Sequence, residues 1–160
     1  MDRLLLVVRH AKSAWPEGVD DHERPLGPRG LEDAPKAGRW LRENGYLPER
    51  VRCSTARRAR ETWRLVSGEF EQQPPVEYDG DLYGGDYLDI ARRTPEDVVR
   101  LALVGHETSV SDVTFQLAGR TAIDAFPTGG VAVFAVTESW ARLERAQLTA
   151  FFRPRDFPGN

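Results

Sequence analysis

The feature that most limits the possible folds is an unbroken apolar run at residues 4–8, Leu-Leu-Leu-Val-Val. A strand with one face in water alternates apolar and polar residues, so this run predicts a strand buried on both faces. The run ends in Arg9 and His10, two polar residues that a buried strand does not need. In open α/β sheets, ligands bind at the carboxyl ends of the strands, so a cation and an imidazole arrive where a site is expected. A strand that simply ends in solvent is the alternative.

Two later segments repeat this pattern. The apolar run at residues 98–104 is followed by Gly105 and His106, and glycine permits a tight turn into a helix whose first backbone N–H groups point outward. The short run at residues 51–54 leads into a predicted helix whose first turns carry Arg57, Arg58 and Arg60. Positive charge is unfavourable at a helix N-terminus. Some of these arginines therefore lie in solvent or bind an anion.

The rest of the chain alternates between strand and helix patterns. Helices are predicted over residues 31–44, 55–66, 86–93 and 109–118. Further strands are predicted over residues 76–78 and 131–136, with residues 140–143 and 147–152 as late or edge strands. The alternation predicts an α/β fold, a three-layer α/β/α sandwich with a mostly parallel central sheet. We expect a single domain over residues 1–160, with residues 154–160 as a loose tail.

Composition limits the class of partner. The net charge is −3, so no global basic field attracts nucleic acid or an anionic membrane, and we expect neither as a partner. Cys53, the single cysteine, lies in a short apolar run, which favours a buried, unreactive thiol. The sequence contains no recognisable signal peptide and no apolar segment as long as a membrane span, so a cytoplasmic location is expected. We expect a monomer.

Two arginines and two histidines at strand ends point to phosphoryl chemistry. Guanidinium groups match phosphate oxygens, and an imidazole can act as nucleophile, proton shuttle or metal ligand. Zinc needs three or four protein ligands and would be repelled by the arginines. In phosphoryl transfer one histidine attacks phosphorus, while the arginines and the other histidine neutralise the charge on the equatorial phosphoryl oxygens. The third histidine, His22, lies in a polar, acidic loop, where we expect it to be a surface residue.

The order of these motifs resembles the histidine phosphatase (phosphoglycerate mutase-like) superfamily. Arg9-His10 resembles its Arg-His-Gly signature, with Ala11 in place of glycine. Residues 54–62 match its Ser-x-x-x-Arg-Ala-x-x-Thr pattern, which selects Arg58 over its neighbours, and Gly105-His106 matches the second histidine. The small size, the segments at residues 9–13 and 24–30, and the turn at residues 128–130 resemble the SixA-type phosphohistidine phosphatase branch.

The resemblance implies that His10 is the nucleophile, that Arg9, Arg58 and His106 hold the phosphoryl group, and that no metal or other cofactor is needed. Glu107 is a further candidate for phosphate binding. The predicted function is a phosphatase that removes the phosphoryl group from protein phosphohistidine through an intermediate on His10. Two alternatives remain: a phosphatase of small-molecule phosphate esters, and a non-catalytic phosphate or phosphoprotein binder. The expected partner is a phosphorylated protein or a small phosphorylated molecule.

The general acid is the weakest part of this match. Larger members of the superfamily carry an acid in a long insertion that this chain lacks, and Asp81 is the nearest candidate by position, with a turn residue as the alternative. An alkoxide leaving group needs a proton, whereas imidazole, with a pKa of about 6.5, needs much less help. A weak or missing acid therefore favours a P–N substrate over a phosphate ester.

Overall fold

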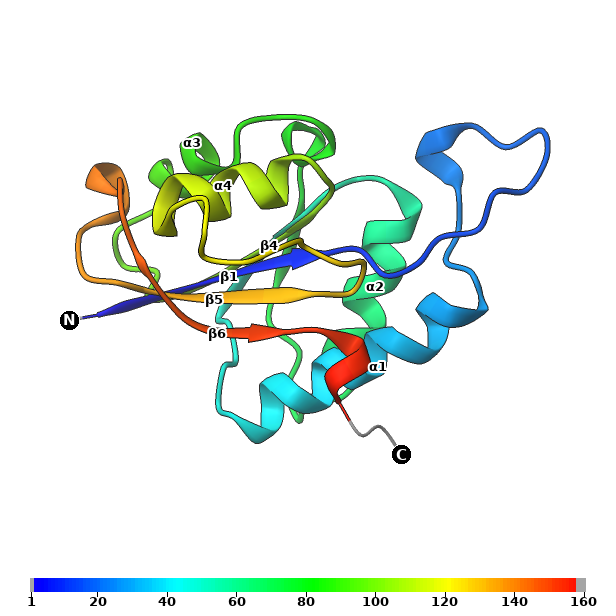
Figure 1. The fold of residues 1–160 in the computed structure, drawn as a ribbon, viewed down its shortest axis with the longest axis horizontal. Helices are drawn as coiled ribbons and strands as arrows, with labels where there is room; N and C mark the ends of the chain where they lie inside the picture. Colours follow the sequence, from blue (N-terminus) through cyan, green and yellow to red (C-terminus); the bar gives the residue numbers. More distant parts are fainter. Residues whose placement is uncertain (1, 158–160) are drawn as a thin grey trace.

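Strand β1 (Arg3–Arg9) lies inside a six-stranded sheet of order β3-β2-β4-β1-β5-β6 in the computed structural model, which describes residues 2–157 (Figure 1). The other strands are β2 (Arg50–Cys53), β3 (Val76–Tyr78), β4 (Arg100–Gly105), β5 (Val131–Val136) and β6 (Gln147–Phe152). Strands β1 to β4 run parallel to one another, whereas β5 is antiparallel to both β1 and β6. The prediction of a mostly parallel sheet is confirmed.

Helices cover both faces of the sheet. They are α1 (Pro28–Glu43), α2 (Arg57–Ser67), α3 (Tyr87–Arg92) and α4 (Ser109–Ala118). Figure 1 shows α3 and α4 on one side of the sheet and α1 and α2 on the other, which confirms the three-layer arrangement.

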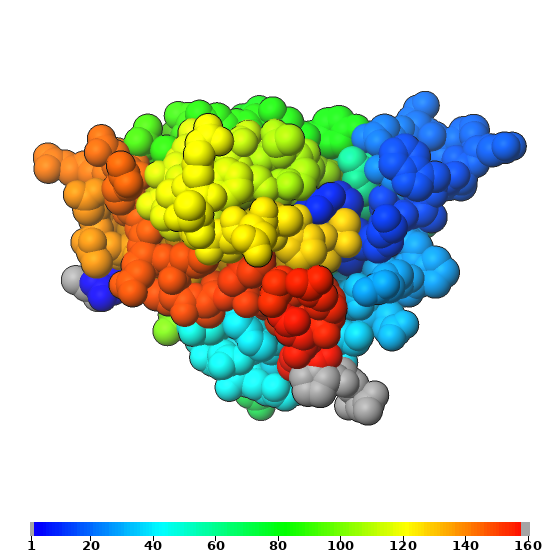
Figure 2. Space-filling model, in the orientation of Figure 1, coloured from blue at the N-terminus to red at the C-terminus, as the bar shows by residue number. Residues whose placement is uncertain are grey.

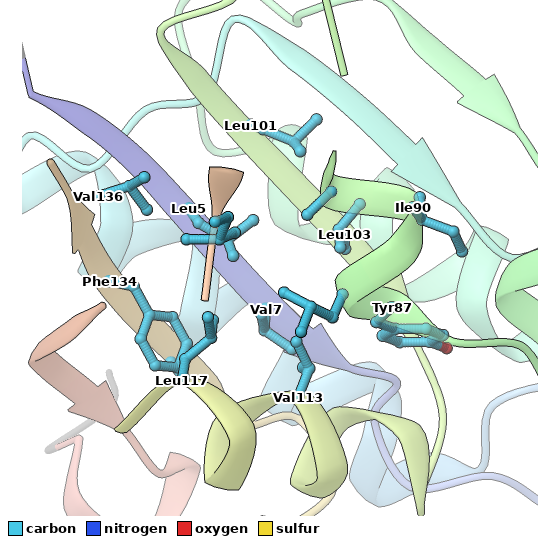
Figure 3. Packing of buried hydrophobic residues seen from close by; sticks show 14 of the residues in the cluster. Leu5, Val7, Tyr87, Ile90, Leu101, Leu103, Val113, Leu117, Phe134 and Val136 are labelled. Carbon is cyan, nitrogen blue, oxygen red and sulfur yellow. The ribbon is translucent and has the colours of Figure 1, made fainter. Parts of the chain in front are cut away.

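Strand β1 supplies side chains to both hydrophobic layers. Leu5 and Val7 pack with α3 and α4 in one cluster, part of which Figure 3 shows. Leu6 and Val8 pack with α1 and α2 in the other cluster. All four side chains are 0–1% exposed, so the strand is buried on both faces, as its unbroken apolar run predicts.

The described residues differ from two expectations for the end of the chain. Residues 140–142 form a short 3₁₀ helix rather than a strand, because Trp140 is fully buried and its indole N–H donates to the Val98 carbonyl at 2.7 Å. The predicted loose tail is ordered at its start, where Pro154 opens a second 3₁₀ helix and is itself buried. Phe157 packs on Phe152 with ring centroids 5.9 Å apart, and residues 158–160 lie outside the described residues.

Cys53 is fully buried at the end of β2, as predicted. Burial raises the pKa of its thiol to about 12, which keeps the sulfur protonated and unreactive. Within residues 2–157, none of the helices has both the length and the apolar character that crossing a membrane requires.

Candidate active site

The parallel pairing of β1 with β4 brings the two strand-end histidines together. Arg9 lies opposite Gly105 in the register, so His10 and His106 leave the sheet side by side. Their ring centroids are 5.2 Å apart, and the two residues are only 7% and 5% exposed. Strand β2, on the other side of β4, ends at Cys53 and is followed by Ser54 and α2, which carries Arg58 into the same region. The residues at these strand ends thus converge at one edge of the sheet.

The hydrogen bond of His10 determines which ring nitrogen can react. Its Nδ1 lies 2.7 Å from the Ala11 carbonyl oxygen, which can only accept, so Nδ1 carries the proton. Nε2 is therefore left with its lone pair available. The Ala11 N–H donates to Thr62 Oγ1 at 2.9 Å, and that hydroxyl donates to the Arg58 carbonyl at 2.7 Å. These bonds hold the segment after β1 against α2 and thereby position His10.

His106 is held by two hydroxyl groups. Its Nε2 lies 2.8 Å from Ser54 Oγ, and its backbone N–H donates to the Tyr87 hydroxyl at 3.0 Å. Tyr87 lies so close to Gly105 that a Cβ there would come within 1.7 Å of the hydroxyl oxygen, so this strand end requires glycine. Nδ1 of His106 is buried and has no hydrogen-bond partner within residues 2–157. When Ser54 donates to Nε2, the imidazole proton lies on Nδ1 as a free donor for an anion.

The two arginines add further unused donors beside the histidines. Arg9 Nη1 donates to the Phe126 carbonyl at 2.7 Å, and Arg58 Nη1 donates to the Asp21 carbonyl at 2.7 Å. The Nε atoms of both guanidinium groups are buried without a partner in the described part of the chain. Buried cationic donors that lack an acceptor are suited to bind an anion such as a phosphoryl group.

Burial and positive charge keep both histidines neutral. Burial is the largest cause and lowers the pKa of His10 to about 3, with His106, Arg58 and Arg9 acting in the same direction. Burial also lowers the pKa of His106 to about 4, and the charge of Arg58 adds to this effect. A neutral imidazole retains the lone pair that attack on phosphorus requires.

We expect the imidazole rings of His10 and His106 to stay neutral from about pH 8 down to about pH 5. Their ¹⁵N chemical shifts should hardly change over this range, and single replacements assign the signals because the chain has three histidines. Unfolded histidines titrate near pH 6.5. As the pH falls from about 6.5 toward 4, the unfolded state binds protons that the folded state does not, so the free energy of unfolding decreases. An ordinary titration of His10 near pH 6.5 would contradict this assignment.

Asp21 joins the site from the start of a short 3₁₀ helix, Asp21–Glu23. Its carboxylate accepts from Arg58 Nη2 at 3.1 Å, from Arg24 Nε at 3.0 Å and from the Tyr83 hydroxyl. The Tyr83 hydroxyl and these arginines hold the pKa of Asp21 well below its usual range, and the same bond to Asp21 raises the pKa of Tyr83. Asp21 is therefore ionised and occupies donors of Arg58 in the absence of an anionic ligand.

The sequence does not predict this network. Asp21 and Tyr83 are 62 residues apart in two short 3₁₀ helices, Asp21–Glu23 and Gly80–Tyr83, and no local periodicity connects them. Arg24 is the one member with a sequence signal, since it belongs to the segment at residues 24–30 of the family resemblance. It is 6% exposed, donates to Ser13 Oγ at 2.7 Å and lies over the exposed ring of Trp15.

The structure does not place Asp81 with the histidines. It lies in the 3₁₀ helix Gly80–Tyr83, where its side chain is 68% exposed and lies 3.7 Å from Arg93. Successive residues of a 3₁₀ helix point about 120° apart, so Asp81 and Tyr83 face different directions. Tyr83 is the one that faces the site, with its ring 5.4 Å from that of His106.

The Glu107 side chain lies close enough to Arg9 for its charge to oppose the lowering of the Arg9 pKa by burial, and it is held by the first turn of α4. Both of its carboxylate oxygens accept from Ser111 in the first turn of α4, one from the backbone N–H at 3.1 Å and one from the hydroxyl at 2.8 Å. A carboxylate also repels phosphate. These two bonds hold the start of α4, and the phosphate-binding role of Glu107 stays a prediction.

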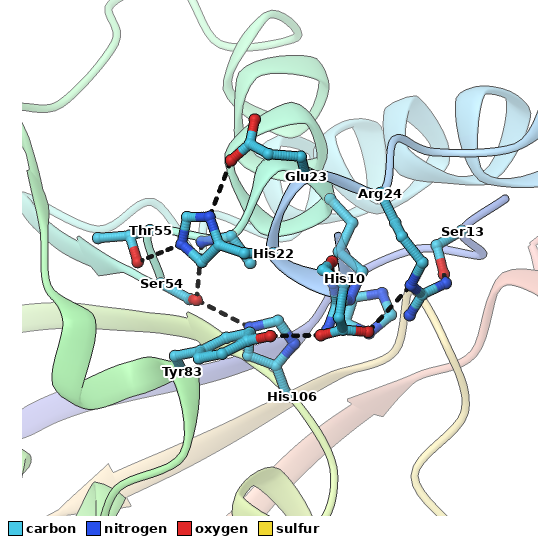
Figure 4. A network of polar contacts seen from close by, with 12 residues as sticks. His10, Ser13, His22, Glu23, Arg24, Ser54, Thr55, Tyr83 and His106 are labelled. Carbon is cyan, nitrogen blue, oxygen red and sulfur yellow. Dashed lines mark hydrogen bonds and ion pairs between the residues drawn. The ribbon is translucent and has the colours of Figure 1, made fainter. Parts of the chain in front are cut away.

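His22 lies at the rim of the site instead of on an isolated surface. Its Nε2 lies 2.8 Å from Thr55 Oγ1 and its Nδ1 lies 2.8 Å from a carboxylate oxygen of Glu23 (Figure 4). Its ring packs edge-on against Tyr83, with centroids 5.2 Å apart. The side chain is 40% exposed, so the expectation of a surface residue holds only in part.

The residues of this site lie in the part of the chain that is similar to a known protein family. The model of the histidine phosphatase superfamily (branch 1) matches residues 5–119. An uncharacterized protein of Mycobacterium tuberculosis is 40% identical over 162 aligned positions, which cover 92% of this chain and all of the relative.

Solved structures share the fold over nearly the whole chain. One from Nakamurella multipartitia, described as a candidate phosphohistidine phosphatase SixA, is 31% identical with a TM-score of 0.83, and the match covers 96% of this chain and 97% of that one. A structure of the protein histidine phosphatase SixA complexed with tungstate has a TM-score of 0.82 at 21% identity, and the match covers 96% of this chain and 98% of that one. At this identity, the similarity supports the shared fold and nothing further.

Proposed function

The chain belongs to the histidine phosphatase superfamily (branch 1), and from this premise we propose that it removes the phosphoryl group from phosphohistidine in a protein. His10 serves as the nucleophile, and Arg9, Arg58 and His106 hold the phosphoryl oxygens. The similarity to a structure described as a candidate phosphohistidine phosphatase supports this substrate. The neutral His10 with a free Nε2, next to unused cationic donors, supports the residue roles.

The reaction proceeds in two displacements. In the first, His10 Nε2 forms a bond to phosphorus while the P–N bond of the substrate breaks. The electron pair of that bond leaves with the substrate imidazole, which departs as a neutral ring because its other nitrogen already carries a proton. In the second, water attacks phosphorus, the Nε2–P bond breaks, and inorganic phosphate leaves with His10 neutral again. Arg9, Arg58 and the Nδ1–H of His106 stabilise the charge on the equatorial oxygens during both steps.

The state of Asp21 is the observation that favours a P–N substrate over an ester. It is the carboxylate in contact with Arg58, and three donors keep it ionised, so it has no proton to give to a leaving group. An alkoxide of high basicity needs such a proton. Imidazole leaves with much less assistance because its pKa is about 6.5.

The test is a paired turnover assay in the presence of a chelator. One peptide carries phosphohistidine, and a second peptide of otherwise identical sequence carries phosphoserine. General acid catalysis contributes about 10²–10⁴-fold, so an enzyme whose site carboxylate has no proton to give is expected to prefer the P–N peptide by at least about a hundredfold in kcat/KM. Preference for the ester would instead identify an ester phosphatase. Phosphate binding with no turnover of either peptide would identify a binding protein.

A further inference from the structure

A groove with a volume of about 780 Å³ runs along α2, outside the phosphoryl site. Three arginines line it, Arg57, Arg60 and Arg64, and so do two carboxylates, Glu23 and Glu61. Their spacing of three and four residues places them on one face of the helix. The chain as a whole carries a net charge of −3, so this cationic face is a local feature.

The local charge pattern of α2 is unfavourable for the helix itself. No acidic residue lies in its first turn, while Arg57, Arg58 and Arg60 all lie near its positive end. Arg58 is accounted for by the phosphoryl site. Arg57 and Arg60 lie outside it, where Arg57 contacts Glu61. Arg60 contacts Glu23 and donates from Nε to the Thr55 carbonyl at 2.9 Å. Residues that act against local stability are expected where they serve a ligand.

The arginines of the groove are available to an anion. Arg57 lies 3.0 Å from Glu61 and Arg60 lies 3.6 Å from Glu23, and both arginine side chains are more than 40% exposed. Such exposed pairs contribute only about 0–1 kcal/mol and exchange readily. Arg64 is exposed and has no ion pair or side-chain hydrogen bond within residues 2–157.

The groove begins where the phosphoryl site ends. Thr55 and Glu23 line the groove, and both contact His22 at 2.8 Å. The His22 ring packs on Tyr83, whose ring lies 5.4 Å from that of His106. One layer of side chains, formed by His22 and Tyr83, therefore separates the groove from His106 in the phosphoryl site. A peptide whose phosphorylated residue enters the site can thus extend its next residues along α2.

We propose that this arginine groove, defined by Arg57, Arg60 and Arg64, binds acidic side chains that neighbour the phosphohistidine in the substrate protein. The proposal rests on the proposed function and adds to it a preference for acidic sequence around the phosphorylated residue. Charge complementarity selects this occupant. A small phosphorylated molecule confined to the phosphoryl site does not contact these arginines.

The test uses two phosphohistidine peptides of equal length, one with aspartate and glutamate around the phosphorylated residue and one with asparagine and glutamine at those positions. We expect kcat/KM to be roughly tenfold higher for the acidic peptide at low salt, chiefly through KM, and the difference to shrink with added salt. The variants R64E and R60E/R64E should reduce this ratio toward one or reverse it. R64Q should give an intermediate ratio.

The matched control is R50E, which makes the same charge change on an exposed residue at the opposite, amino-terminal end of β2. It should leave the ratio as in the wild type. Equal turnover of both peptides by the wild type would overturn the groove proposal while leaving the proposed function intact. Turnover of neither peptide would overturn both.

Discussion

Replacement of His10 with alanine is expected to lower kcat/KM for a phosphohistidine peptide by at least about 10⁴-fold. The reason is that Nε2 of His10, whose Nδ1 is committed to the Ala11 carbonyl, is the atom proposed to receive the phosphoryl group. Without it, both displacements lose their common intermediate. Wild-type enzyme rapidly quenched during turnover of labelled substrate should carry an acid-labile, base-stable phosphoryl label, and the variant should carry none.

The control for this variant is phosphate binding measured by calorimetry. Arg9, Arg58 and His106 remain in H10A, so the variant should still bind inorganic phosphate, which shows that the pocket is folded. Residual turnover within about tenfold of wild type, or a label that persists in the variant, would assign the nucleophile to another residue.

Replacement of Arg58 with alanine is expected to lower kcat/KM by about 10²–10³-fold. This side chain is 7% exposed, so its charge acts on the phosphoryl oxygens with little screening by water. Its loss also removes two donors from Asp21 and a positive charge that lowers the pKa of both His10 and His106. The pKa values of both histidines should therefore rise in R58A, and kcat and KM should be measured separately alongside the ¹⁵N titration.

Two further variants make the Arg58 result specific. R58K keeps the charge but loses the planar pair of donors, so its kcat/KM should lie between those of R58A and the wild type. R50A removes an exposed arginine from the far end of β2 and should behave as the wild type. An R58A variant within about threefold of the wild type would show that Arg58 does not hold the phosphoryl group.

The fold was predictable where local pattern and environment agree. The apolar run at residues 4–8 and the run that ends at Gly105 can only be stable when buried, and both are interior strands. Helix α4 and strand β5 lie at the residues that their patterns predict. The strand predicted over residues 140–143 is wrong because a short apolar segment does not distinguish an edge strand from a 3₁₀ turn that buries Trp140.

The convergence of Arg9, His10, Arg58 and His106 was also predictable from sequence. Each follows a predicted strand, and the carboxyl ends of parallel strands meet at one edge of a sheet whatever the strand order. Pattern alone does not, however, establish that β4 lies between β1 and β2 or that β5 runs antiparallel to β1. These depend on which strands pair across long separations.

The carboxylate of the site was decided by tertiary structure alone. Sequence position favours Asp81, yet the turn of its 3₁₀ helix leaves it exposed beside Arg93 and directs Tyr83 toward His106. Asp21 reaches Arg58 from a separate 3₁₀ helix because Arg24 and Tyr83 hold its carboxylate. Thus the sequence by itself determined the sheet, its helices and the residues at the strand ends, because these follow from local periodicity. The positions of Asp21 and Tyr83 in the site depend on contacts between distant segments, which only the folded chain brings together.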